Sequence, residues 1–290
     1  MVSRHSAFYS PLISAISAGF LQQEGLEPTY SIMTPKKSLA EGLADGSVHV
    51  AQSAVSASWG PMDNGMPNTL MHFAQINERD GFFIAGREPD PDFSWDKLLG
   101  HDVLVDHYGQ PLAMFRFAAH KVGVQYAAII AIDAGDVHEI QQAFYDGKGD
   151  YVHLQGPLPQ QMERDGSAYV VASVGQVIGP VAFSSLAATR EWLATDVARA
   201  FMRAYRRARD YVNEASAMEI AESEAEFFKG VDHQALADAI KFYQGLGCWN
   251  PDIHITRKHY EVALDVFLHS GMIKKRHRYD DVVMLPPDER

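Results

Sequence analysis

The first 57 residues alternate between helix-like and strand-like patterns, and this alternation constrains the fold more than any other feature of the sequence. Apolar residues recur at helical spacing between Pro11 and Gly25, and a second helical pattern covers residues 36–46. The segments Thr29–Met33 and Val48–Ala51 are short and rich in β-prone residues. Strands separated by helices pair in parallel sheets, so the sequence predicts an α/β fold.

The ends of these strands indicate where a ligand would bind. In parallel α/β sheets the ligand lies beyond the carboxyl ends of the strands. The turn before the first helix and the polar end of the strand at 48–51 both meet this condition. The predicted ligand contacts in this part of the chain are Tyr9, Ser10, Gln52, Ser53 and Ala54.

Several short motifs resemble those of type 2 periplasmic-binding proteins. They are Tyr-Ser-Pro at 9–11, Gly-Ser-Val-His-Val-Ala at 46–51, Trp-Asp-Lys-Leu-Leu-Gly at 95–100 and Asp-Val-His-Glu at 136–139. The chain resembles the branch that contains nitrate, sulfonate and taurine binders and the thiamine-pyrimidine-precursor proteins. This resemblance implies a two-lobed α/β fold with mixed, mainly parallel sheets flanked by helices, two hinge crossings and a ligand enclosed between the lobes.

Two irregular segments indicate where the chain crosses between lobes. Residues 88–92 contain prolines that interrupt regular structure, and residues 175–181 combine glycine and proline after a predicted strand. We expect lobe 1 to comprise residues 1–88 and 179–290, and lobe 2 residues 89–178. Within lobe 1 we expect the segments Thr69–Ile76 and Gly81–Ala85 to be strands. Such crossings form the hinge on which two lobes close.

Two turns in the predicted second lobe add ligand contacts. Tyr108, Gly109 and Gln110 follow a buried strand and open a helix, whose free N–H groups and positive dipole end attract anions. In the family that the chain resembles, this turn faces the ligand, although an ordinary capped helix start also explains the pattern. Gln155 and Gly156 follow the strand at 151–154 and are expected on the opposite side.

The remaining chain reads as mostly helical. Asp136 and Glu139 form the pattern of a capping box, and Thr195 is expected to cap a long helix. The arginines of that helix, at 199, 203, 206, 207 and 209, are expected largely on its solvent-exposed side. Further helices are predicted at 217–228, 233–245 and 256–270.

Charge and composition restrict the classes of partner. The chain has 25 Lys and Arg against 37 Asp and Glu, a net charge of −12, which disfavours nucleic acid as a partner. No run of about 18 apolar residues exists, so no membrane span is predicted. Residues 1–7 are too short and polar for a secretory signal. The localisation is therefore left open: periplasmic if a leader was removed, otherwise cytoplasmic.

The sequence contains none of the common catalytic, nucleotide-binding or metal-binding motifs. The His-Glu-x-x-His, Gly-x-Ser-x-Gly, Gly-x-Gly-x-x-Gly and phosphate-loop patterns are all missing. Cys248, beside Trp249, is expected to be a small buried filler, because no nearby base or helix N-terminus would activate it. We therefore predict no catalytic residue, no metal and no cofactor.

Three interpretations of function follow from these observations. The first is a solute-binding protein of an ABC-type importer, with a small polar or anionic organic ligand and a membrane permease as partner. The second is a cytoplasmic enzyme on the same fold, similar to thiamine-pyrimidine synthases or to desulfinases and decarboxylases, with His49, His72 or His107 as acid–base groups. The cysteines that the resemblance to such enzymes would require near the first cleft loop are missing. The third is a sensor or interaction module.

Overall fold

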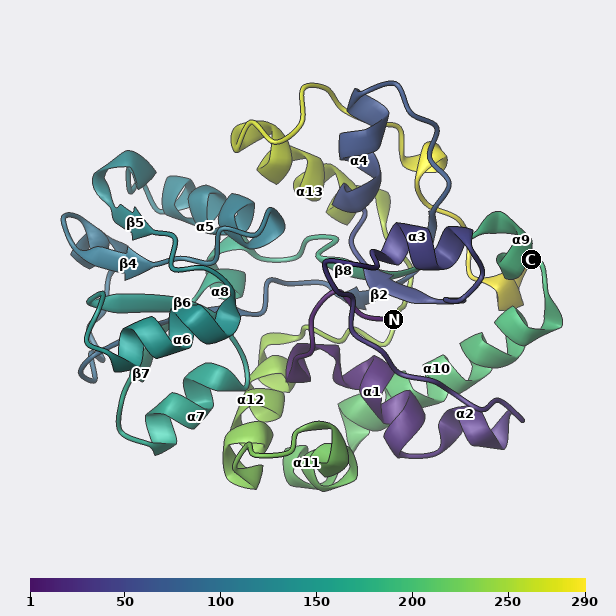
Figure 1. The fold of residues 1–290 in the computed structure, drawn as a ribbon, viewed down its shortest axis with the longest axis horizontal. Coiled ribbons are helices and arrows are strands. Elements are labelled where there is room, and N and C mark those ends of the chain that lie inside the picture. Colours follow the sequence, from purple (N-terminus) through teal and green to yellow (C-terminus); the bar gives the residue numbers. More distant parts are fainter.

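The computed structural model describes residues 1–290 and contains two β-sheets, each with helices packed against it (Figure 1). The three-stranded sheet consists, in spatial order, of β1 (Ala51–Ser53), β8 (Ser184–Ala188) and β2 (Met71–Asn77). The five-stranded sheet consists of β5 (Ile130–Ile132), β4 (Asp102–Leu104), β6 (Tyr151–Gln155), β3 (Phe82–Gly86) and β7 (Tyr169–Ser173).

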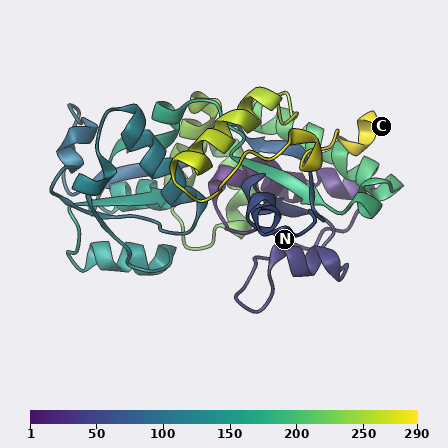
Figure 2. The same cartoon turned by 90° about the horizontal axis from the view of Figure 1, so that it is seen from above.

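The helices divide between the two sheets. We call the part around the three-stranded sheet the first lobe and the part around the five-stranded sheet the second lobe; they lie side by side along the long axis of the molecule (Figures 1 and 2). The helices of the first lobe are α1 (Ser10–Ser17), α2 (Phe20–Gln23), α3 (Leu39–Ala44), α4 (Ser56–Asp63), α9 (Arg190–Leu193), α10 (Asp196–Glu214), α11 (Ala217–Glu224), α12 (His233–Leu246) and α13 (Arg257–His269). The second lobe has α5 (Gln110–Lys121), α6 (Val137–Tyr145) and α7 (Leu158–Arg164), and α8 (Val174–Ile178) lies in the segment that returns to the first lobe.

In each sheet, the strand that follows a crossing between lobes runs antiparallel to both of its neighbours. In the first lobe β8 runs antiparallel to both β1 and β2. In the second lobe β4 pairs in parallel with β5 and β6, whereas β3 runs antiparallel to β6 and β7. The predicted α/β fold with mixed sheets flanked by helices is confirmed. The sheets are not mainly parallel as expected, because four of the six strand pairs, β1–β8, β2–β8, β3–β6 and β3–β7, are antiparallel.

The N-terminal segment extends the first sheet by isolated parallel bridges. Val2 bridges Ile32 on one side and Gln52 on the other, and its amide donates to the Ser31 carbonyl at 2.8 Å. The strand predicted at 29–33 is therefore reduced to one bridge, because it lies at the sheet edge with Val2 as its only partner, and Ile32 is 47% exposed. The strand predicted at 48–51 begins only at Ala51.

The strand predicted at 81–85 exists, but its placement in the first lobe was wrong. Phe82–Gly86 pairs with β6, where Phe82 lies opposite Gln155, and with β7 on its other side. The chain therefore crosses before the proline-containing segment, at residues 78–81, and returns at 174–183. We propose that the division into lobes falls at these residues instead of at 88/89 and 178/179.

The two crossings are bonded to each other. The Val181 amide donates to the Glu78 carbonyl at 2.8 Å, and the Phe183 amide donates to the Asn77 carbonyl at 3.2 Å. A Cβ atom added to Gly175 would lie 2.2 Å from the Asp80 carbonyl oxygen. The two crossings thus run in close backbone contact, which a side chain at position 175 would prevent.

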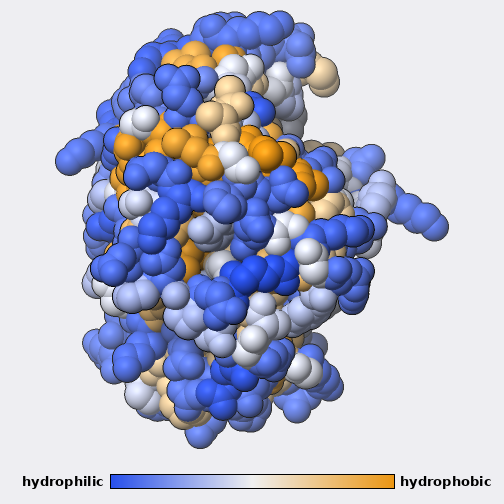
Figure 3. Space-filling model, turned by 90° about the vertical axis from the view of Figure 1, so that its left-hand side faces the viewer, coloured by the Kyte–Doolittle hydropathy of each residue, from blue (hydrophilic) through white to orange (hydrophobic).

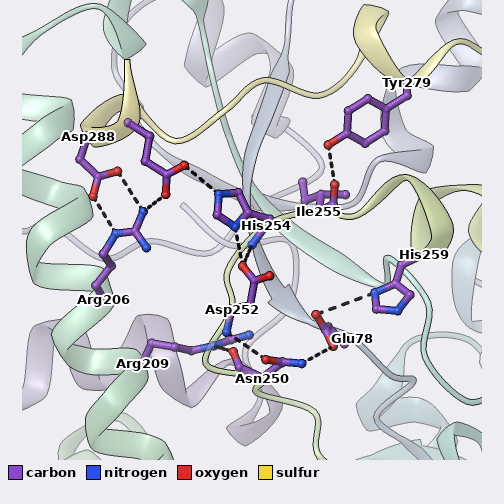
Figure 4. A network of polar contacts seen from close by, with 11 residues as sticks. Glu78, Arg206, Arg209, Asn250, Asp252, His254, Ile255, His259, Tyr279 and Asp288 are labelled. Carbon is purple, nitrogen blue, oxygen red and sulfur yellow. Dashed lines mark hydrogen bonds and ion pairs between the residues drawn. The ribbon is translucent and has the colours of Figure 1, made fainter.

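A polar network anchors the first crossing to the first lobe (Figure 4). Arg209 on α10 is fully buried and donates through Nε to the Asn250 carbonyl at 2.7 Å, while the Asn250 amide donates to the Glu78 carboxylate at 3.2 Å. His259 lies 3.8 Å from the same carboxylate. The prediction that the α10 arginines face solvent was wrong for Arg209, because its position four residues after the buried Tyr205 places it on the core face.

The surface of the second lobe carries an apolar band. Figure 3 views this lobe end-on and shows orange, hydrophobic residues crossing its upper part between hydrophilic regions. Strand β5 is the edge of the sheet, and Leu99, Val122 and Ile130 are among the exposed apolar side chains of this lobe. No helix in the structure combines the length and apolar character needed to cross a membrane.

Candidate ligand-binding site

Seven residues converge between the two lobes, and we call them the inter-lobe cluster. The first lobe contributes Arg4 and Tyr9, and the second contributes Asp106, which follows β4. The cluster consists of Arg4, Tyr9, Asp80, Phe82, Asp106, His153 and Gln155. Phe82 and Gln155 are opposite residues on β3 and β6, and His153 is two residues before Gln155, so all three side chains share one face of the second sheet. Asp80 comes from the first crossing.

Direct contacts hold Arg4 in this cluster. Its Nη1 atom lies 2.6 Å from Asp106 Oδ2, which joins the first lobe to the second by an ion pair. The guanidinium also lies over the Phe82 ring, 5.4 Å from its centroid, and Phe82 stacks on His153 with 4.5 Å between ring centroids. The ring of Phe115 on α5 packs against His153 from another side. The cluster therefore combines one paired cation, aromatic faces and neutral polar groups.

Several polar atoms of the cluster are buried without a hydrogen-bond partner. Apart from the two atoms of the Arg4–Asp106 ion pair, they are Asp80 Oδ2, both ring nitrogens of His153 and both terminal atoms of the Gln155 side chain. Asp80 and His153 are completely buried, and Gln155 is 3% exposed. Because burying an unpaired polar group is costly, such atoms in a folded protein are typical of a place where a ligand or water completes the bonding.

Burial also sets the protonation of the cluster. It raises the pKa of Asp80 to about 8, with Asp106 adding to the effect and the hydrogen bond from the Phe82 amide opposing it. Burial, with smaller contributions from Arg4 and His107, lowers the pKa of His153 to about 3, so the imidazole is neutral. Burial raises the pKa of Tyr9 to about 12, against the influence of Arg4 and Gln155. At neutral pH the unpaired groups are therefore predominantly uncharged.

Further hydrogen bonds close the lobes around the cluster. Ser6 donates through Oγ to the Gly156 carbonyl at 2.5 Å, and the Gly156 amide donates to the Tyr243 hydroxyl at 2.8 Å. Gln110, at the start of α5, accepts from Ser56 Oγ at 2.8 Å and donates to the Phe183 carbonyl at 2.7 Å. Two surface hollows of about 570 and 590 Å³ lie elsewhere and include no residue of the cluster. Every residue of the cluster except Arg4 is buried, so the cluster is enclosed.

Four of the ten predicted contact residues lie at or beside this cluster. Tyr9 and Gln155 belong to it, and Gln110 and Gly156 form the bonds between lobes. Tyr108 follows Asp106 closely in the turn, with its amide donating to Asp106 Oδ1 at 2.9 Å, but its side chain is 63% exposed. Gly109 adopts φ +53° as the residue before α5.

The other predicted contacts lie within the first lobe. Ser10 donates through Oγ to the Ala7 carbonyl and to Glu224 Oε2 at 2.9 Å. Gln52 accepts at Oε1 from the Ser3 amide and hydroxyl. Ser53 is buried in β1, and Ala54 follows it partly buried. The hydrogen-bonding capacity of Ser10 and of the Gln52 oxygen is thus already used inside this lobe.

The histidines considered as acid–base groups are separated in the structure. His72 is completely buried in the first sheet between Ser185 and Ser58, and burial lowers its pKa to about 3. His49 lies beside Trp192 with 6.5 Å between ring centroids. Of the three, His107 alone influences the cluster, through its effect on the pKa of His153. Cys248 is completely buried, and burial raises the pKa of its thiol.

Arg4, Asp80, Phe82, Asp106 and His153 were not among the predicted contacts. Asp106 carried the strongest signal, since it is a carboxylate just after a buried strand and before the turn that was selected. Arg4 likewise follows the bridge at Val2. The antiparallel direction of β3 brings Phe82, at its beginning, to the carboxyl end of β6, and a parallel arrangement would not have done so.

Comparison with known protein families identifies the family to which the chain belongs. A family model described as "NMT1/THI5 like" matches residues 7–216. The chain belongs to the NMT1/THI5-like family. The Bacillus subtilis (strain 168) protein named "Putative binding protein YtlA" is 29% identical to this NMT1/THI5-like chain over 285 residues, covering 96% of the chain and 85% of the relative.

Solved structures share the fold of this NMT1/THI5-like protein. The alkanesulfonate-binding protein SsuA from Xanthomonas axonopodis pv. citri, bound to MOPS, matches with a TM-score of 0.75 at 15% identity, covering 97% of this chain and 96% of that one. The desulfurization enzyme DSZB matches with a TM-score of 0.69 at 10% identity, covering 100% of this chain and 96% of that one. At these identities the likeness establishes the periplasmic-binding-protein fold alone.

Proposed function

We propose that this NMT1/THI5-like protein is the solute-binding component of an ABC-type importer and that it encloses a small polar organic molecule between its lobes. The observation that carries the proposal is the inter-lobe cluster, in which Asp80, His153 and Gln155 are buried with unpaired polar atoms at the junction of two sheets. The binding-protein name of its relative and the fold shared with an alkanesulfonate-binding protein support the same function.

The chemistry of the cluster suits enclosure of a partly planar ligand. Phe82 and His153 offer aromatic faces, the Gln155 amide offers both a donor and an acceptor, and Tyr9 offers a hydroxyl. Ligands of the sulfonate, nitrate, taurine or pyrimidine-precursor classes are the candidates that the family resemblance implies. Because the cluster is enclosed, entry requires the lobes to separate about the two crossings, and a membrane permease would receive the released ligand.

A matched pair of glutamine variants tests the site. Gln155→Ala removes a buried amide of the cluster, so we expect the dissociation constant for a ligand found by thermal-shift screening of metabolites to rise about 10-fold or more. Gln141→Ala, on the exposed face of α6, should leave it unchanged. A bound ligand at about 100 times its dissociation constant adds about 2.7 kcal/mol of stability, which such a screen detects. Equal affinity in both variants would contradict the placement of the site.

Mass spectrometry separates binding from catalysis. The fold also occurs in a desulfurization enzyme, and His107 lies near the cluster, so the same site is compatible with an enzyme. A binding protein returns its ligand chemically intact after prolonged incubation. Recovery of a transformed product in amounts exceeding the protein would favour the enzyme.

A further inference from the structure

Two carboxyl groups are completely buried in this protein, and only one of them is bonded at both oxygens. Glu224 on α11 accepts from Ser14 at 2.6 Å through Oε1 and from Ser10 at 2.9 Å through Oε2. Asp80 accepts from the Phe82 amide at 2.6 Å through Oδ1, and its Oδ2 has no partner. Asp80 and Glu224 are equally buried, so what distinguishes them is that one carboxyl oxygen of Asp80 has no hydrogen-bond partner.

The free oxygen belongs to the inter-lobe cluster. The charge of Asp80 acts on the hydroxyls of Tyr9 and Tyr243 and on the Cys248 thiol, and Asp106 acts on Asp80 from the second lobe. Burial raises the pKa values of both tyrosines and of the cysteine, so these neighbours carry no charge at neutral pH. Asp80 and Asp106 therefore lie close enough for the charge of Asp106 to act on Asp80 across the junction of the lobes.

The one cation identified in the cluster is already paired. Arg4 lies 2.6 Å from Asp106 Oδ2, so its charge offsets that of Asp106. An anionic ligand enclosed here would find no free cation in the cluster and would make the ionisation of Asp80 still less favourable, and a low-dielectric environment makes a buried charge without a counter-ion costly. A ligand with N–H groups would instead donate to Asp80 Oδ2, and a positive charge on it would balance an ionised Asp80.

We propose that Asp80 is a specificity-determining residue that selects a ligand bearing a protonated amine or amidine and disfavours nitrate and simple sulfonates. This inference rests on the proposed function, since it names the ligand class of the same site. In the bound state Asp80 Oδ2 accepts a charge-assisted hydrogen bond from the ligand, while Gln155 and His153 complete the remaining polar contacts.

Proton release provides a signature of this arrangement. Because the pKa of Asp80 is raised to about 8 in the ligand-free protein, the carboxyl is mostly protonated at pH 7. A cationic ligand stabilises the ionised carboxylate, so its binding releases about one proton and its affinity rises as the pH increases towards about 8. A neutral or anionic ligand would not displace this proton.

Charge-fractionated metabolites serve as the probe, because they can be tested before the ligand is identified. Small-molecule extract from bacterial cells is separated by ion exchange into cationic, neutral and anionic fractions, and each is tested by thermal shift on the full chain. The cationic fraction should stabilise the wild type, and the active compound isolated from it is then titrated by calorimetry in two buffers of different ionisation enthalpy. Nitrate and methanesulfonate serve as the defined anions.

Two variants make the test specific to the free oxygen. Asp80→Asn retains an acceptor for the Phe82 amide but loses the charge, and we expect about a 10- to 100-fold loss of affinity together with loss of proton release. Glu224→Gln alters the other buried carboxyl, which is bonded at both oxygens, and should retain both properties. Circular dichroism verifies that each variant is folded, and proton release by the wild type gives an independent readout if Asp80→Asn fails to fold.

Each alternative outcome is decisive. Stabilisation by the anionic fraction, nitrate or methanesulfonate would overturn the role of Asp80 and leave the proposed function intact. Stabilisation by the neutral fraction alone, or unchanged affinity in Asp80→Asn, would do the same. If neither the fractions nor the whole extract stabilise the protein, the proposed function falls with the inference.

Discussion

Asp80 and Glu224 show how a single partner atom separates a structural carboxyl group from a functional one. Burial raises the pKa of both to about 8. Two serine hydroxyls from α1 complete the bonding of Glu224, which joins α1 to α11. Asp80 keeps a free oxygen beside the other lobe. Burial alone would therefore not distinguish them; the count of hydrogen-bond partners does.

The raised pKa of Asp80 predicts how its replacement alters the pH dependence of stability. A carboxyl whose pKa is higher in the folded state stabilises the fold while protonated, and this contribution is lost as the pH rises from the ordinary pKa of 3.8 to about 8. Asp80→Asn has no titratable group at this position, so it does not lose stability in this way. The free energy of unfolding of Asp80→Asn minus that of wild type should therefore increase with pH, by up to about 1.4 kcal/mol per pH unit across this window.

Urea denaturation of the two proteins between about pH 5 and pH 8 measures this difference directly. Wild type and Asp80→Asn should diverge steadily as the pH increases. Parallel curves across the window would show that Asp80 is ionised in the folded protein, and would remove the proton-release signature as well.

Two residues of the inter-lobe cluster were predicted from the sequence, and the others were not, for a physical reason. Tyr9 and Gln155 were predicted because they stand at strand ends, where the α/β rule expects ligands. Asp80 and Arg4 follow segments whose partners are distant in the chain, so their burial depends on packing that periodicity does not encode. Whether these residues contact a ligand stays a prediction that the variants above test.

At the scale of elements, helix caps were predicted correctly from local sequence patterns, but the pairing of a strand was not. The capping box at Asp136 and Glu139 and the cap at Thr195 are confirmed, since these contacts are made within a few residues. The strand at Phe82–Gly86 was recognised by its composition but assigned to the wrong sheet. The pattern of a strand predicts which of its residues are buried but not which strand it pairs with. The pairing depends on where the chain crosses from one lobe to the other.

The close backbone contact of the two crossings predicts a large effect of a small substitution. In Gly175→Ala the new Cβ would lie 2.2 Å from the Asp80 carbonyl oxygen, so the crossings must move apart. We expect a destabilisation of about 1–3 kcal/mol, because the obstacle is backbone that cannot rotate away. Ligand affinity should fall in parallel, since Asp80 moves with the crossing. Chemical denaturation and ligand titration measure the two effects.

Gly245→Ala provides the matched control. Gly245 lies in α12 with nothing within 4 Å of an added Cβ, so alanine should stabilise that helix by up to about 1 kcal/mol. Equal stability of the two glycine variants would show that the crossings tolerate separation and that the hinge region is looser than the structure indicates.

At the scale of the whole molecule, the family and the fold were recognised from the sequence, and both are confirmed. The motifs that carried the recognition lie at helix starts and strand ends, where backbone geometry restricts the choice of residue. The relative position of the lobes could not be predicted, because it depends on a few bonds between distant segments, such as those of Gln110 with Ser56 and Phe183.

Gln110 predicts a measurable change in overall shape. Gln110→Ala removes both of its bonds between α5 and the rest of the molecule, so the ligand-free protein should shift towards a more open arrangement. Small-angle X-ray scattering should show a larger radius of gyration, which added ligand reduces. Gln142→Ala, on α6 within the second lobe, should scatter as wild type does. An unchanged radius in Gln110→Ala would mean that other contacts hold the lobes together.

The order of strands along the chain has a consequence for biosynthesis. The second sheet is encoded without interruption, from residue 82 to residue 173, whereas the central strand of the first sheet, β8, comes only at residues 184–188. On the ribosome, the later-encoded lobe can therefore assemble while β1 and β2 still lack the strand that joins them. A stalled nascent chain in which residues 1–183 have emerged from the ribosome and β8 has not should protect the second sheet from protease and leave the first exposed.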